Sequence, residues 1–235
     1  MCRTAMQDAP ARPMLAAMIG RHLTRDWIAA NAIGEMLGLG LAALIAIGVA
    51  QSHALPPPVE VLVVTAAFLA IGAYEGAIVG VAQWLVLRRL LPSLRAKSWI
   101  AATVTGAVVA WMLGRIPSAL ADWESVSGGV GQPAPSLWMI VGLSAAAGAV
   151  LGVILGAAQW FVLREHVRRA RMWIAANALA WAAAMPLIFI AAGIPGPHTS
   201  VASIGALLLV TVGLAGAVVG AIEAVFLRLL LRPAR

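Results

Sequence analysis

The chain has 235 residues, of which 62% are hydrophobic and only 11% are charged, and its mean hydropathy is +0.95. No water-soluble core needs so large an apolar share, so the composition excludes an ordinary soluble domain. The net charge of +7 would suit a nucleic-acid-binding protein, but the basic residues flank long apolar stretches, which is the placement typical of a membrane protein. We therefore expect the lipid bilayer, and no nucleic acid, as the main partner.

The N-terminal segment, residues 1–26, contains charges and prolines and no uninterrupted apolar core. It therefore does not have the pattern of a cleaved signal peptide, and we expect it to be a cytoplasmic segment. Residues 27–235 are predicted to form a single membrane domain. The only cysteine is Cys2, which excludes an internal disulfide bond.

Six apolar stretches are long enough to cross a bilayer, because about 20 helical residues span a hydrocarbon core of ~30 Å. In chain order they cover residues 27–50, 61–87, 99–118, 136–163, 173–194 and 201–227.

One pattern of glycines, an amide or acid, leucine and arginine ends the second, fourth and sixth stretches. Its copies are Gly76/Gly80/Gln83/Leu87/Arg88, Gly152/Gly156/Gln159/Leu163/Arg164 and Gly216/Gly220/Glu223/Leu227/Arg228. A second pattern, Trp-Ile-Ala-Ala, opens the stretch before each copy, at Trp27, Trp99 and Trp173. We therefore predict an all-α fold of six transmembrane helices, built as three repeated hairpins over residues 27–98, 99–172 and 173–235.

The glycines lie three and seven positions before the Gln or Glu, so all three residues share one helix face. Small residues on one face allow close approach of helix backbones in lipid. We predict a pseudo-threefold bundle in which the second helices of the hairpins pack on one another through these faces. The alternative is that each glycine face packs against the first helix of its own hairpin.

Fifteen of the 16 Lys and Arg residues flank the predicted spans on one side, and Arg115 is the exception. By the positive-inside rule that side is cytoplasmic, so both termini are predicted to be inside. Most of the nine tryptophans fall at the predicted interfaces, where we expect them to act as membrane anchors.

A ring of polar side chains is predicted about 6–7.5 Å inside the cytoplasmic interface. The first helices contribute one residue each after their interfacial tryptophan, and the second helices contribute one each before their interfacial arginine. The six are Asn31, Gln83, Thr103, Gln159, Asn177 and Glu223. We expect them to form hydrogen bonds across each hairpin, and favour a packing role over a pathway for solute.

Two acidic residues are predicted deeper in the bilayer, Glu35 at about 12 Å and Glu75 at about 20 Å from the cytoplasmic interface. Neither has an acidic counterpart in the other repeats, and ionisable residues at such depth are functional candidates. Arg115 is predicted at nearly the depth of Glu75, so an ion pair between them is the structural alternative. Glu35 has no evident basic partner, so we expect it to be protonated and regard it as the best candidate for a proton-linked role.

Catalytic and metal-binding patterns are weak. Ser144 and His198 resemble the serine and histidine of rhomboid proteases only in placement, since Ser144 is followed by alanine where that family has glycine. His53 and His198, with Asp122 or Glu124, are the only candidate metal ligands on one side. We predict no catalytic residues, no metal and no cofactor.

The blocks Gln83–Arg88 and Gln159–Arg164, each followed by Trp-Ile-Ala-Ala, resemble a group of uncharacterised prokaryotic multi-pass membrane proteins with recurrent Gln-Trp-x-Val-Leu-Arg blocks. The third block differs, because Ala224 follows Glu223. The resemblance implies a prokaryotic inner or plasma membrane and no particular activity.

Two functions remain open at this point. We favour a non-enzymatic accessory or scaffold protein, with other membrane proteins as candidate partners, because few polar residues lie inside the spans. The alternative is a transporter or channel for a small solute or ion, coupled to protons through Glu35.

Overall fold

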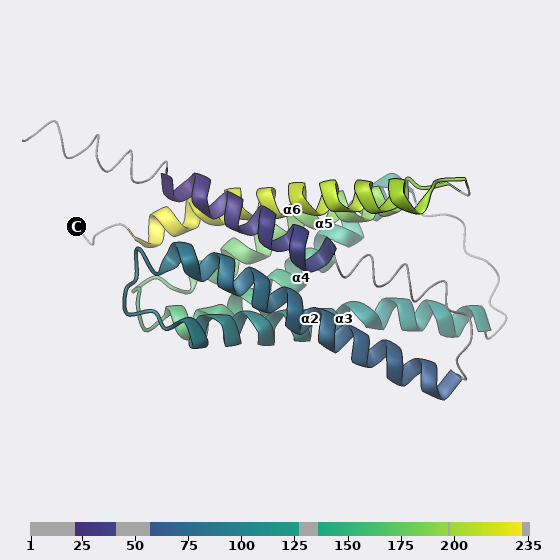
Figure 1. Ribbon diagram of the computed structural model, residues 1–235, viewed down its shortest axis with the longest axis horizontal. Helices are drawn as coiled ribbons and strands as arrows, with labels where there is room; N and C mark the ends of the chain where they lie inside the picture. Colours follow the sequence, from purple (N-terminus) through teal and green to yellow (C-terminus); the bar gives the residue numbers. More distant parts are fainter. Residues whose placement is uncertain (1–21, 41–56, 127–135, 197, 232–235) are drawn as a thin grey trace, which may run out of the picture.

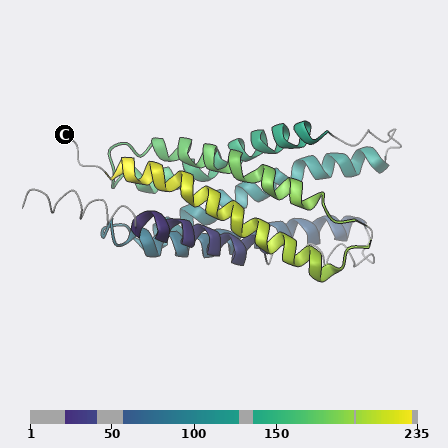
Figure 2. The same ribbon diagram turned by 90° about the horizontal axis from the view of Figure 1, so that it is seen from above.

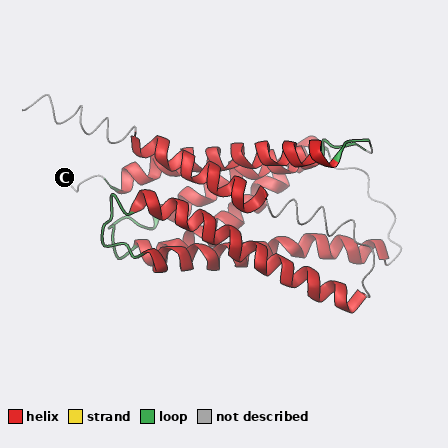
Figure 3. Ribbon diagram, viewed as in Figure 1, coloured by secondary structure: helices red, strands yellow, loops and turns green. Residues whose placement is uncertain are grey.

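The computed structural model describes residues 22–40, 57–126, 136–196 and 198–231, which are all-helical apart from short connections (Figure 3). A first helix covers residues 22–40. It is followed by α2 (Pro57–Leu87), α3 (Ala96–Val126), α4 (Leu137–Leu163), α5 (Met172–Ala192) and α6 (Val201–Leu230) (Figure 1). The helices α2 to α6 each contain a stretch long and apolar enough to cross a membrane, which supports a multi-pass membrane protein.

The helix boundaries follow local sequence signals. Pro57 begins α2, a position where its missing N–H costs nothing. Ser136 and Ser200 precede α4 and α6, and their hydroxyl groups accept hydrogen bonds from backbone N–H groups in the first turn. The last residues of the predicted first span, 41–50, lie outside the described residues.

One predicted boundary is wrong. The third span was expected to end at residue 118, with a loop after it, but α3 continues to Val126. The residues beyond the expected end, among them Asp122 and Glu124, are polar in part and remain helical. Polarity alone does not end a helix, because residues such as Ala, Leu and Glu in this segment favour helix in water as well.

The helices form an elongated bundle (Figures 1 and 2). The loops over residues 88–95 and 164–171 lie at one end of it, together with the beginning of the 22–40 helix and the end of α6. Both loops are rich in arginine, and we call this the basic end. Asp26 of the first helix is linked to Arg89 of the first of these loops by an ion pair of 3.1 Å.

The glycines of α2 and α4 pack against the helix that follows in the chain. A Cβ atom added to Gly76 would lie 2.7 Å from the Cα of Val104 in α3, and one added to Gly156 would lie 2.9 Å from the Cα of Ile174 in α5. These backbones are therefore in direct contact, and no side chain larger than hydrogen fits between them.

The glycines of α6 pack against the first helix of the chain. A Cβ added to Gly216 would lie 2.7 Å from the carbonyl oxygen of Asn31, and one added to Gly220 would lie 2.8 Å from the Cα of Ile28. The described helices therefore contact one another in chain order, and α6 returns to the 22–40 helix to close the ring.

This packing differs from both arrangements expected for the glycine faces. Gly80 and Gly152 likewise face the first helix of the next hairpin, and not another second helix or their own hairpin partner. The own-hairpin contact uses other glycines, Gly34 against α2 and Gly106 against α4. The repeated glycines of each second helix thus form the contact with the first helix of the next hairpin.

Candidate functional site

The tryptophans that open the first helix of each predicted hairpin lie inside the bundle. Trp27, Trp99 and Trp173 are at most 1% exposed, and the ring centroids are 5.8 Å apart for Trp27 and Trp173 and 6.3 Å apart for Trp99 and Trp173. The expectation that they anchor the protein in the lipid interface is therefore wrong. Their position in the sequence fits an interface, but the side chains point toward the bundle core, where large rings bury the most apolar area.

The repeated leucines join the same cluster. Leu87, Leu163 and Leu227 are each 1% exposed and pack with the three tryptophans near the basic end. Together these six residues form an apolar plug, which closes the interior of the bundle at this end.

A hydrogen-bonded belt lies next to the apolar plug. The six polar residues expected in a ring are all buried, and we call them the polar belt: Asn31, Gln83, Thr103, Gln159, Asn177 and Glu223.

Bonds within the belt run from helix to helix. The indole N–H of Trp173 donates to Gln159 Oε1 at 2.8 Å. Gln159 Nε2 donates to Gln83 Oε1 and Thr103 Oγ1, each at 3.0 Å. Gln83 Nε2 donates in turn to Asn31 Oδ1 at 2.9 Å. The two glutamines therefore join five helices, and their buried amides are not left without partners.

At the repeat position of Gln83 and Gln159 the third hairpin has an acid, Glu223, and one of its carboxyl oxygens has no hydrogen-bond partner among the described residues. Trp27 donates to Glu223 Oε2 at 3.0 Å, but Glu223 Oε1 and Asn177 Oδ1 have no hydrogen-bond partner among the described residues. In the first two hairpins the corresponding acceptors, Asn31 and Thr103, each receive an amide N–H from glutamine. A glutamic acid can supply this donor only when its carboxyl group is protonated.

In both Gln-Trp-x-Val-Leu-Arg blocks the arginine lies over the tryptophan ring, near the basic end. The guanidinium carbon of Arg88 lies 5.1 Å from the ring centroid of Trp84, and that of Arg164 lies 5.2 Å from Trp160. The four-residue spacing places each arginine over the ring one helical turn before it. Both residue pairs therefore stabilise the ends of α2 and α4.

Glu75 lies further from the basic end, on α2. Its Oε2 accepts a hydrogen bond of 2.5 Å from the indole N–H of Trp111 in α3. The side chain of Arg115, the ion-pair partner considered for Glu75, lies outside the described part of the structure. The described partner of Glu75 is thus a neutral donor, which satisfies one carboxyl oxygen.

Glu35 lies between the polar belt and Glu75. Its side chain packs on α6, where a Cβ added to Gly216 would lie 2.9 Å from its Cγ, while Glu75 packs in the same way on Gly38 of the 22–40 helix. Glu35 is close enough to both Glu75 and Glu223 for electrostatic interaction, and its Oε2 has no partner among the described residues. The three acids therefore form a series from the middle of the bundle to the polar belt.

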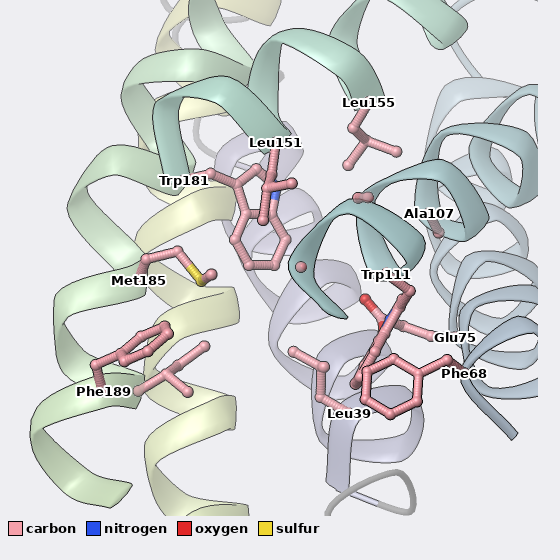
Figure 4. A pocket seen from close by; sticks show the side chains of 13 residues that line it. Leu39, Phe68, Glu75, Ala107, Trp111, Leu151, Leu155, Trp181, Met185 and Phe189 are labelled. Carbon is pink, nitrogen blue, oxygen red and sulfur yellow. The ribbon is translucent and has the colours of Figure 1, made fainter. Parts of the chain in front are cut away.

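A pocket of about 320 Å³ lies beside Glu75 in the middle of the bundle (Figure 4). Side chains of α2, α3, α4 and α5 line it, together with Leu39 of the first helix. Among the described residues, the lining is apolar and aromatic except for Glu75. Figure 4 shows two groups of side chains on opposite sides of it, Trp181, Met185 and Phe189 on one and Phe68, Glu75 and Trp111 on the other.

The pocket lies where the three repeats differ. Alignment of the hairpins places Glu35, Ala107 and Trp181 at one position, and Glu75, Leu151 and Ala215 at another. Four of these six line the pocket: Glu75, Ala107, Leu151 and Trp181.

This pocket was not expected from the sequence. The sequence does contain one signal for it. Glu35, Ala107 and Trp181 occupy one aligned repeat position, and side chains of such different size cannot fill equivalent spaces. The indole N–H of Trp181 also lacks a partner among the described residues, as does one oxygen of Glu35, the residue at its equivalent position. Buried polar groups without partners are uncommon and often mark functional regions.

The weaker catalytic candidates do not come together. The hydroxyl group of Ser144 donates to the carbonyl oxygens of Ile140 and Val141 in its own helix, and His198 is exposed in the connection before α6. Within the described ranges, no three His, Cys, Asp or Glu side chains are grouped as metal ligands. His53 lies outside those ranges, and the side chains of Asp122 and Glu124 are not described.

No protein-family model, curated protein or solved structure matches this chain.

Proposed function

We propose that the protein is a non-enzymatic transporter of a small solute, with the pocket beside Glu75 as its binding site and Glu35 as its proton-coupling residue. The observation that carries the proposal is the pocket itself, an apolar cavity inside a membrane bundle whose described wall contains one carboxyl group. Pockets with this combination, mostly apolar with one or a few polar groups, are the usual form of small-molecule sites. An intramembrane carboxyl group is a typical component of solute and proton pathways.

The division between repeated and unrepeated residues supports this assignment. The repeated residues of the two motifs form the glycine contacts, the apolar plug and the polar belt, which together provide a rigid frame. The residues that break the repeat, Glu75 and Trp181, line the pocket, and Glu35 lies between the pocket and the belt. A scaffold protein would need only the frame. This division shifts our preference from the scaffold, favoured by sequence alone, to the transporter.

A route for protons is supported by the series Glu75, Glu35 and Glu223. Glu35 interacts electrostatically with both others, so a proton gained or lost at one changes the proton affinity of the next. Glu223 at the inner end is hydrogen-bonded to Trp27 of the apolar plug. We infer that protons reach the pocket from the basic end through these carboxyl groups.

A movable element is also present beside the pocket. Pro186 lies within α5, between the pocket-lining residues Met185 and Ile188. Proline cannot donate a backbone hydrogen bond, so the helix is weakened at this turn and can bend there. Bending of α5 would change the shape of the pocket without disturbing the polar belt.

For the architecture, we propose six spans with pseudo-threefold symmetry, in the inner or plasma membrane of a prokaryote and with both termini cytoplasmic. The equivalent contacts of the three glycine pairs, each against the first helix of the next hairpin, support the symmetry. The arginine-rich loops at the basic end support the orientation. In this orientation the apolar plug and polar belt lie toward the cytoplasmic side.

The test is flux in proteoliposomes. The purified protein would be reconstituted, and a panel of gradients imposed, covering protons, alkali cations, chloride and small organic amines. We expect at least one gradient to drive flux above that of protein-free vesicles, with the flux strongly reduced by Glu75→Gln. Gln keeps an acceptor for the Trp111 N–H, so the variant removes the charge and preserves the bond. Absence of flux under every gradient would contradict the transporter and leave the scaffold as the better assignment.

A further inference from the structure

We propose that the pocket binds an organic monocation with a compact apolar body, its charge held by Glu75 and the neighbouring aromatic rings. This inference rests on the proposed solute-binding function and adds the chemical class of the solute.

The charge of the solute follows from Glu75. Its carboxyl group is the only ionisable group among the described residues that line the pocket, and its described partner, Trp111, is neutral. A carboxylate in an apolar cavity is costly unless an opposite charge accompanies it. A bound cation supplies that charge, whereas a bound anion would add a second unpaired charge. One lining carboxylate matches one positive charge.

The aromatic residues support the same class. Trp111 packs edge-on against Phe68 at a centroid distance of 5.4 Å, and Trp181 and Phe189 approach from the other side of the pocket. Ring faces attract cations, most strongly for tryptophan and in desolvated surroundings. A quaternary or alkylammonium group between Glu75 and these rings would therefore be held on several sides without a water shell.

The remaining lining limits the size and polarity of the solute. Apart from Glu75 and the aromatic residues, the described wall consists of aliphatic groups and methionine, among them Leu39, Leu151, Leu155 and Met185, which provide no strong hydrogen-bonding group. The volume of about 320 Å³ is at the small end of the ~300–1,000 Å³ range of ligand pockets. A hydrated metal ion or a sugar would leave its polar groups unsatisfied here, so the body of the cation must be apolar.

Binding of benzyltrimethylammonium provides the test, with neopentylbenzene as the uncharged molecule of the same shape. Equilibrium dialysis against the full chain in nanodiscs measures both, with empty nanodiscs as background. We expect the cation to bind at least about tenfold more tightly than its uncharged analogue, and Glu75→Gln to weaken cation binding by at least about tenfold with little effect on the analogue.

The matched control is Glu165→Gln, which removes an exposed carboxyl group at the basic end, outside both the pocket and the series of buried acids. It should leave cation binding within about twofold of the unmodified protein, since distant sites act independently. Equal binding of cation and analogue would overturn the cation assignment and leave the pocket as a site for neutral solutes. Binding of neither would overturn it too, and the flux panel would then decide the proposed function separately.

Discussion

The indole nitrogen of Trp27 donates a hydrogen bond of 3.0 Å to a carboxyl oxygen of Glu223, and so joins the first helix to the last. The same two helices are in backbone contact at Gly216 and Gly220. In the second and third hairpins the equivalent indole–amide bond joins Trp173 to Gln159, which follow each other closely in the chain. The Trp27–Glu223 bond therefore corresponds to the Trp173–Gln159 bond and closes the ring of helices, whereas the third equivalent indole N–H, that of Trp99, has no partner among the described residues.

Replacement of Glu223 tests whether the acid acts as a protonated substitute for glutamine. We expect Glu223→Gln to leave the free energy of unfolding unchanged within about 1 kcal/mol or to raise it, because glutamine can accept from Trp27 and donate to the unpartnered Asn177 Oδ1. Trp27→Phe should lower it by more than the ~0.6–1.7 kcal/mol typical of an interhelical hydrogen bond in membranes, because the smaller ring also leaves a cavity in the apolar plug. Denaturant unfolding in mixed micelles measures both. A clear loss of stability in Glu223→Gln would show that the belt requires a charge at this position.

Because α4 packs closely on α5, substitutions at two glycines of α4 should differ strongly in their effect on stability. We expect Gly156→Leu to destabilise the protein by ~3 kcal/mol or more, because a Cβ there already meets the backbone of Ile174 and a larger side chain would separate the helices. Thermal unfolding in detergent is the measurement.

The control is Gly142→Leu, also in α4, where an added Cβ meets nothing within 4 Å and the residue is exposed. It should change the unfolding temperature little. Similar effects of the two substitutions would mean that loss of helical glycine, and not steric separation of α4 and α5, determines the response.

The all-helical, multi-pass fold could be predicted from sequence because hydropathy depends only on local composition, and the ends of α2 to α6 fall within a few residues of the expected spans, apart from the C-terminal extension of α3. The helix that each glycine face contacts could not be predicted from sequence. The glycine spacing identifies a contact face, but whether Gly76 meets its own hairpin or the next one depends on the order of helices around the ring. For the same reason Trp27 was placed at the correct level but facing the wrong way.

The candidate site was predictable in part. The belt residues share a depth, which spacing reveals, whereas the pocket depends on how Ala107, Leu151 and Trp181 fail to fill equivalent volumes in three dimensions. Glu75 and Glu35 were identified as unusual from depth alone. That Glu75 lines a cavity and Glu35 does not is a consequence of side-chain direction, which only the helix packing determines.

Topology is tested by cysteine labelling in intact cells, after Cys2→Ser removes the native thiol. We expect a membrane-impermeant maleimide to label His198→Cys from outside, and to leave Arg95→Cys and Arg168→Cys unlabelled until the membrane is permeabilised. All three side chains are exposed in the structure, so access depends only on the side of the membrane. Labelling of the two arginine positions in intact cells would reverse the orientation or change the number of spans.

Proton coupling is tested by Glu35→Gln. If Glu35 gains and loses a proton during transport, glutamine cannot replace it, and pH-driven flux in proteoliposomes should fall to the protein-free level. If Glu35 is only a neutral hydrogen-bonding group, glutamine has nearly the same size and bonding capacity, and flux should persist. The free energy of unfolding should change little in either case, since one Glu35 oxygen has no partner to lose.

Because Glu35 does not line the pocket, benzyltrimethylammonium should still bind to the variant, so that lost flux with retained binding assigns the defect to coupling. Flux at the unmodified rate would remove Glu35 from the mechanism and leave Glu75 as the remaining intramembrane acid that contacts the solute.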